Sequence, residues 1–308
     1  MTRTLFCLIL AVVLRAQTIE QPARAVTDPG VVTTRQAITP AGVASIFQGR
    51  VSSIVFGEDS SEVWVLHRTY LYRMNWKENR VADRYALGGN AGLQSIASAG
   101  GQIYAAVSRQ RKIGLMSAGA GGARDVALGL GTYNAGAIAA GAGKALIPVT
   151  TDNLLAVVDL VSGQPPGKIP TGKAPFAAVM NREGTVAWVS NWGGRVPEAK
   201  DLTAPTGDRP DSDRVVVNAH GIAASGTVSR IDLIAGKVTH SLATELHPTA
   251  LAWDEKAGRL YVANSNSDSI TVINAAANSV ARHIPLQPFA KKTPGVAPTA
   301  LALADEGK

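Results

Sequence analysis

The residues PTALAWDEKAGRLYVANSNSDSITVINAAANSVARHIPL, numbers 248–286, decide the fold of this chain. They contain four short apolar runs, which are separated by turns of charged, glycine-containing or small polar residues. The same pattern recurs upstream from Pro175, and its opening is repeated from Pro298. A period of about 40 residues with four short strands in each repeat is typical of the blades of a β-propeller.

Proline opens each of these repeats at the start of a first strand, where its missing N–H removes no hydrogen bond from the sheet. Weaker copies of the pattern begin at Val51, Leu93 and Ala135. We therefore predict an all-β fold, a β-propeller with five complete four-stranded blades and the start of a sixth. Helical periodicity is absent after the first residues, and the glycine-rich residues 114–131 are expected to form a turn between two blades.

The N-terminus has the composition of a secretory signal peptide, residues 1–16. A positive charge precedes the apolar residues 5–14, and Ala16 offers a small residue at the cleavage point. That apolar run is too short to span a bilayer, so we expect no transmembrane anchor in the mature chain. Residues 17–49 lead into the propeller, and residues 31–49 could lend a strand to its last blade.

The propeller, residues 50–308, is expected to be incomplete at its C-terminus. Lys308 falls in the turn after the first strand of the sixth blade, so the remaining three strands have no sequence. The pattern favours a truncated propeller of the seven-blade type, because an open ring exposes unpaired backbone. A closed ring of five blades with a spare tail is the alternative.

Cysteine and charge exclude several classes of function. The only cysteine, Cys7, lies in the leader, which excludes disulfides, thiolate metal sites and cysteine nucleophiles from the mature chain. Export without disulfides favours a bacterial periplasmic or secreted protein. The formal net charge of +7 is scattered along the chain, so we do not expect nucleic acid as a partner.

Two insertions interrupt the repeat, residues 191–225 between the second and third strands of the fourth blade and residues 287–297 after the fifth blade. In an up-and-down blade these two connections emerge on the same face, and loops on a rigid scaffold often bind ligands. The candidate ligand-binding residues of this rim are Asn191, Trp192, Arg195, Asp208, Asp211, Asp213, His220, Asn264, Lys291 and Lys292.

Each candidate also has a plainer interpretation. Trp192 and Arg195 could present a ring and a guanidinium to a ligand, or Trp192 could pin its own loop to the blade. Asp208, Asp211 and Asp213 could share a divalent cation such as calcium, or form a solvated acidic turn. No cofactor is predicted.

The remaining polar candidates lack partners at a recognisable spacing. His220 could serve as a base or a ligand, or could pack within its loop. Asn191, Asn264 and His67 follow second strands in three blades, where they could converge at the channel mouth or cap their own turns. No spacing of a metal-binding histidine pair, nucleophile elbow or phosphate loop is present.

These units resemble a known repeat family. The runs LYVAN (260–264) and SITVIN (269–274), with Pro248 and Pro298 opening their strands, look like the YVTN-type (YncE-like) propeller repeats of secreted bacterial proteins. The segments 38–50, 71–81 and SNWGGR (190–195) are similar to the propeller part of bifunctional proteins with a C-terminal alkaline-phosphatase-like phosphoesterase domain. In that family the metal ligands and the nucleophile belong to the second domain, so the resemblance carries no catalytic residue over to this chain.

Three functions follow as hypotheses. The first is a non-catalytic binding or scaffold module whose rim binds an envelope protein, a ligand or a phosphoesterase domain. The second is an enzyme that hydrolyses a small ester or lactone, which requires acids, histidines or a metal at the channel mouth. The third is periplasmic electron transfer, for which the chain lacks a ligand pattern.

Overall fold

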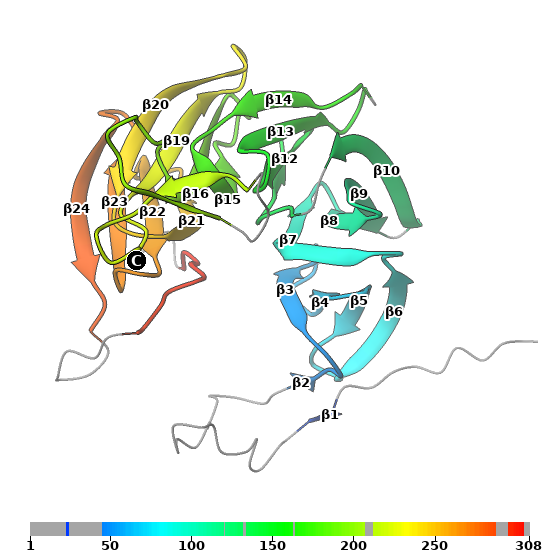
Figure 1. Ribbon diagram of the computed structural model, residues 1–308. Helices are drawn as coiled ribbons and strands as arrows, with labels where there is room; N and C mark the ends of the chain where they lie inside the picture. Colours follow the sequence, from blue (N-terminus) through cyan, green and yellow to red (C-terminus); the bar gives the residue numbers. More distant parts are fainter. Residues whose placement is uncertain are drawn as a thin grey trace, which may run out of the picture.

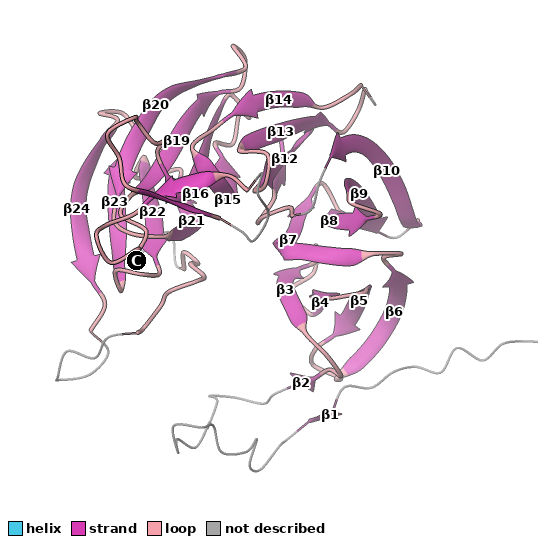
Figure 2. Cartoon of the chain, in the orientation of Figure 1, coloured by secondary structure: helices cyan, strands magenta, loops and turns pink. Residues whose placement is uncertain are grey.

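A computed structural model describes residues 23–24, 45–119, 121–131, 134–162, 164–206, 212–287 and 295–304 of the chain. In these residues the regular elements are all strands, and twenty of them form five four-stranded antiparallel sheets. Figure 1 shows the sheets following one another around a common centre, with their first strands innermost. Figure 2 shows that strands make up the regular structure of every blade. This is the architecture of a β-propeller, as the repeat predicts.

Each blade is a meander of strands that follow one another in the chain. Blade 1 contains β3 (Val51–Phe56), β4 (Glu62–His67), β5 (Tyr70–Asn75) and β6 (Arg80–Ala86). Blade 2 contains β7 (Asn90–Ala99), β8 (Gln102–Arg109), β9 (Lys112–Gly119) and β10 (Gly122–Gly131). Blade 3 contains β11 (Ala139–Gly141), β12 (Lys144–Val149), β13 (Leu154–Asp159) and β14 (Gly167–Pro170).

The fourth blade contains the insertion. It consists of β15 (Lys173–Met180), β16 (Val186–Gly194), β19 (Gly226–Asp232) and β20 (Lys237–Thr244). Between β16 and β19 a separate small hairpin forms from β17 (Thr203–Pro205) and β18 (Arg214–Val216). Blade 5 contains β21 (Pro248–Asp254), β22 (Arg259–Asn264), β23 (Ser269–Asn274) and β24 (Ser279–Pro285).

Apolar side chains from adjacent blades pack together and form the core. Between blades 4 and 5, for example, Trp188 and Val228 pack in one cluster with Leu251 and Val262. Both faces of a middle blade are covered in this way, which explains why the second strands are continuous apolar runs with no alternation of polar residues. Burying one such side chain contributes about 1.5–3 kcal/mol to stability.

The innermost strands approach closely enough to exchange hydrogen bonds between blades. Ala137 N–H donates to Phe176 O at 2.7 Å, and a Cβ on Gly136 would lie only 1.8 Å from that oxygen. The buried Ser190 hydroxyl donates to Thr249 O at 2.7 Å and accepts from Ala177 N–H at 3.1 Å. A small residue is therefore required where two of these backbones meet, as at Gly136, because a larger side chain would separate them.

Several details differ from the sequence prediction. The glycine-rich residues 114–131 were predicted as a turn, which is wrong: they belong largely to the paired strands β9 and β10. In residues 31–49, Ser45–Ile46 pairs with Ala23–Arg24 as β2 and β1, and does not join a blade. Residues 298–303, predicted to open a sixth blade, are not part of a strand ladder in the described chain. The predicted signal peptide lies outside the described residues, which include no helix long and apolar enough to cross a membrane.

The Ser190 hydroxyl tests the contact between inner strands. Replacing it in Ser190→Ala leaves the buried Ala177 N–H and one lone pair of Thr249 O without a partner, so we expect a loss of about 1–3 kcal/mol in the free energy of unfolding. Urea denaturation followed by far-UV circular dichroism measures this loss. Ser241→Ala, on the exposed side of β20, is the matched control and should change stability by less than about 0.5 kcal/mol. Equal losses in the free energy of unfolding for the two variants would show that the Ser190 hydrogen bonds do not stabilise the contact between the inner strands.

Candidate functional site

The described parts of the two insertions lie on one face of the propeller, as the strand order requires. Asn191 near the end of β16 pairs with Pro175 in β15, so residues 195–225 leave the blade on the side where the first strand begins. The connection after blade 5 reaches the same side. There the Asp268 carboxylate accepts hydrogen bonds of 2.8 Å from Gly295 N–H and Ala297 N–H. We call this face the insertion rim.

Asp213 ties the insertion to two blades. Its carboxylate accepts from Lys173 Nζ at 2.7 and 2.8 Å, and Asn153 Nδ2 donates to its second oxygen. Burial alone would raise the pKa of Asp213, but the hydrogen bonds from Lys173 and Asn153 outweigh it and lower that pKa. Because Asn153 belongs to blade 3 and Lys173 to blade 4, the insertion spans the boundary between them.

A second ion pair gives the insertion its local shape. Arg195 bonds both oxygens of Asp201, at 2.6 and 2.7 Å, and Glu198 N–H donates to the same carboxylate at 2.6 Å. The hydrogen bonds from Arg195 and then from Glu198 N–H lower the pKa of Asp201 to about 2. The guanidinium proposed from sequence to contact a ligand is therefore engaged by Asp201 within its own loop.

Trp192 joins blade 4 to blade 5 through an aromatic stack. Its ring lies between Phe176, with centroids 4.0 Å apart, and His247, with centroids 4.7 Å apart. His247 contacts Ser265 Oγ at 2.7 Å through Nδ1, and burial lowers the pKa of the imidazole. This geometry matches the plainer interpretation, in which Trp192 packs against the blades, and it is a contact that sequence spacing did not indicate.

Asn191 and Asn264 occupy equivalent buried places in their own blades. Asn191 Nδ2 donates to Thr227 Oγ1 and Ser229 Oγ, both at 3.0 Å. Asn264 Nδ2 donates to Ser269 Oγ at 3.0 Å and to Thr271 Oγ1 at 2.8 Å. Both side chains are fully buried. Each donates to hydroxyl groups of its own blade, and the two asparagines are not hydrogen-bonded to each other. Both residues lie in strands, although Asn191 was predicted to begin a loop.

The other candidates are placed as follows. His220 is exposed in a turn, where its backbone N–H donates to Asn218 Oδ1 at 2.9 Å. Asp208, Asp211, Lys291 and Lys292 lie outside the described residues. No group of three or more histidine, cysteine, aspartate or glutamate side chains that could hold a metal ion occurs among the described residues. The ligand-binding roles of the ten candidates stay predictions.

The structure also gathers a polar cluster that the sequence reading missed. The Ser269 hydroxyl donates to the Glu245 carboxylate, and His283 Nδ1 lies 3.5 Å from Glu245 Oε2 and 3.0 Å from Thr271 Oγ1. His283 Nδ1 lies near both Glu245 and Thr271, whereas the Ser269 hydroxyl donates to Glu245. The Ser269 and Thr271 side chains are buried. The cluster is thus not arranged as a nucleophile, base and orienting acid.

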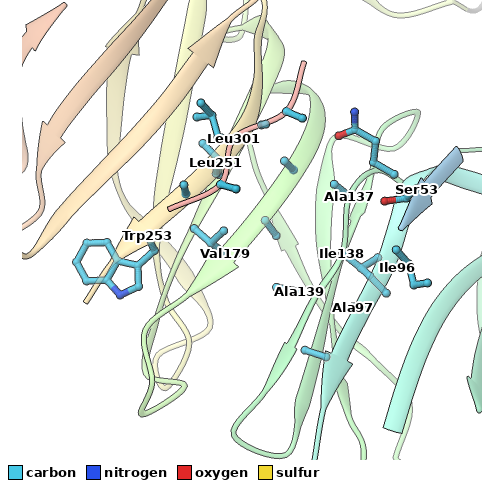
Figure 3. Close-up of a pocket in the computed structure, with 18 of the residues that line it drawn as sticks. Ser53, Ile96, Ala97, Ala137, Ile138, Ala139, Val179, Leu251, Trp253 and Leu301 are labelled. Carbon is cyan, nitrogen blue, oxygen red and sulfur yellow. The ribbon is translucent and has the colours of Figure 1, made fainter. Parts of the chain in front are cut away.

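The first strands enclose a central cavity of about 1080 Å³. Figure 3 shows Ile96, Ile138, Val179 and Leu251, from four successive blades, lining it together with Leu301. Polar side chains are few: Ser52, Ser53 and Gln94, whose amide donates to Thr299 O at 3.0 Å. The cavity can hold an apolar ligand, but its lining supplies no charged group.

Comparison with known proteins supports the fold class. A search of solved structures finds hydrazine synthase of Kuenenia stuttgartiensis with a TM-score of 0.62 and 13% sequence identity, covering 84% of this chain and 72% of that chain. At this identity the likeness shows the fold alone, and the chain is an all-β propeller. No protein-family model matches the sequence, and no curated protein matches it.

The Asp213 anchor predicts how the insertion responds to proteolysis. Asp213→Asn removes the charge that pairs with Lys173, so we expect trypsin to cleave at Lys200 several-fold faster at pH 7, which corresponds to about 1 kcal/mol of lost anchoring. The lowered pKa of Asp213 means that the anchor is present above about pH 3.9 and is lost as the pH falls through the folded-state value. Asp125→Asn, which breaks an ion pair in blade 2, should leave cleavage at Lys200 unchanged.

The stacked His247 predicts a pH dependence of stability. Because burial lowers its pKa, the folded state favours the neutral imidazole. Stability should be complete above the unfolded-state pKa of about 6.5 and should decline as the pH falls below it. His247→Phe keeps a ring against Trp192 and should remove this part of the decline, measured as the difference in urea midpoint between pH 7.5 and pH 5. Parallel curves for the two proteins would show that His247 does not contribute.

Proposed function

We propose that this chain is a non-catalytic binding module that recognises a protein partner through the insertion rim. The observation that carries the proposal is the set of apolar side chains on the insertion itself. Val196, Leu202 and Ile222 are each between 52% and 58% exposed, on a loop that Lys173 and Asp201 hold in place. Several exposed apolar side chains on one ordered loop that also carries charged residues are typical of protein interaction sites.

The resemblance to YVTN-type (YncE-like) repeats supports a more specific proposal. In it the module is exported to the periplasm or secreted, and its partner is an envelope protein or a phosphoesterase domain of the alkaline-phosphatase-like class. The absence of cysteine after Cys7 fits export but does not identify the partner.

The central cavity favours one alternative, hydrolysis of a small ester or lactone. Its volume and apolar lining suit a ring ester. A general acid, a base or a metal ion would then have to reach the cavity from residues other than those that line it. Turnover of 4-nitrophenyl acetate or γ-butyrolactone by the purified chain, in buffers with calcium or zinc, would support this alternative and count against a purely binding role.

Site-directed photo-crosslinking tests the binding role. A photo-reactive phenylalanine at Leu202 or Ile222 should form a discrete adduct in cells, because these side chains face the expected partner. The matched controls are Val161 and Ile234, which are 87% and 76% exposed on turns away from the insertion, and these positions should give no adduct. The same adducts from all four positions would show nonspecific contact and would overturn the proposed role of the rim.

A further inference from the structure

Blade 1 presents an apolar face that the other blades bury. Ile54 pairs with Val65 in the blade 1 ladder at the position that Ile96, Ala178 and Leu251 hold in blades 2, 4 and 5. Those three residues are only 7%, 5% and 8% exposed, because the preceding blade covers them, whereas Ile54 is 64% exposed. Phe56, two residues further along the same face of β3, is 59% exposed.

Part of the same face is already packed. Val65, Tyr72 and Val81 form a buried cluster, and Phe47 covers it with its ring centroid 5.2 Å from that of Tyr72. The uncovered residues are those nearest the central cavity, on β3. Figure 1 shows β3 at the inner edge of blade 1, opposite the last segment of the described chain.

Residues 298–303 follow a connection of the same kind as those that lead into the first strands of blades 4 and 5. Ala297, before Pro298, has a positive φ of 45°, as Ala174 and His247 have before Pro175 and Pro248, with φ of 51° and 57°. Asp268 Oδ1 accepts from Ala297 N–H as Asn153 Oδ1 accepts from Ala174 N–H, each at 2.8 Å. The blade-to-blade connection is therefore built in the same way at both places.

The segment also rests on blade 5 as a first strand should. Thr249 Oγ1 donates to Pro298 O at 2.9 Å, and Leu301 packs against the cluster of Ala250, Ala263 and Ile270. Leu301 corresponds to Leu251 when Pro298 is aligned with Pro248. In the described residues no strand is laddered to this segment, although Pro298 O and Thr299 O accept hydrogen bonds from the side chains of Thr249 and Gln94. A segment without a ladder can pair with a further strand.

We propose that the Ile54 and Phe56 face of blade 1 is a docking surface for a blade-type antiparallel sheet of the same polypeptide, in which residues 298–303 form the innermost strand. The face and the strand are complementary: one needs an apolar sheet to cover it, and the other needs strands to extend it. Packing of such a sheet on β3 closes the ring and removes both exposed edges. This inference concerns a different face from the insertion rim and does not depend on the proposed function.

The test compares Ile54→Asp with the matched control Ile96→Asp, in the 308-residue chain and in the complete product of the reading frame. In the complete product we expect Ile54→Asp to lower the thermal midpoint by about 5 °C or more, comparable to Ile96→Asp, because both charges would be buried. In the 308-residue chain Ile54→Asp should change the midpoint by less than about 1 °C, while Ile96→Asp should still lower it. Slow amide exchange of β3 in the complete product alone would be the second supporting result.

Any of three results would overturn the proposal. If Ile54→Asp leaves the complete product unchanged, or if that product ends at Lys308 and remains monomeric, no sheet covers the face. If the 308-residue chain forms a dimer in analytical ultracentrifugation and Ile54→Asp dissociates it, a second copy occupies the face in place of a further sheet. All three results can be interpreted even if Ile96→Asp fails to fold, because Ile54 is exposed and its substitution leaves the described packing intact.

Discussion

The close approach of the first strands is the constraint on which the rest of the structure depends. Ala137 and Phe176 exchange a backbone hydrogen bond between blades 3 and 4, and Ser190 links blades 4 and 5 through Thr249. These contacts fix the distance and the angle between blades, so the larger side chains behind them can pack in layers. They also explain why small residues stand where two backbones meet, as at Gly136, while larger side chains of the first strands point into the cavity or between blades.

A hydrogen bond between a turn side chain and a backbone N–H recurs at the connections between blades. A side-chain oxygen in the turn between the second and third strands caps the backbone N–H of a residue with positive φ before the proline of the next blade, as Asn153 does for Ala174. In blade 4 the insertion replaces that turn. The stack of Trp192 on His247 lies at the corresponding boundary, so the blade that gains a long loop has an aromatic contact to its neighbour.

This arrangement places the variable part of the molecule on a fixed base. The insertion is held by charged side chains at Asp213 and Asp201, and it leaves the apolar side chains of Leu202 and Ile222 in solvent. By contrast, the polar residues nearest the blade, Asn191 and Asn264, are fully buried, and their Nδ2 groups donate to hydroxyl groups of their own sheets. Binding at the rim therefore depends on the loop more than on the polar residues of the strands.

The sequence by itself determined the strand pattern, the number of complete blades and the face on which the two insertions emerge. These features follow from short-range periodicity and from the up-and-down order of strands, both of which are local properties. It failed at residues 114–131, because glycine in a strand that packs closely against its neighbours looks like glycine in a turn.

Only the tertiary structure decided the partners of the candidate residues. Lys173 and Asp213 are 40 residues apart, and the ring of Trp192 meets a histidine of the next blade, so no spacing rule connects them. The tertiary structure also distinguished Ile54 from Ile96. The two residues occupy the same place in their blades, and whether such a residue is buried depends on the sheet in front of it, which is a property of the ring and not of the repeat.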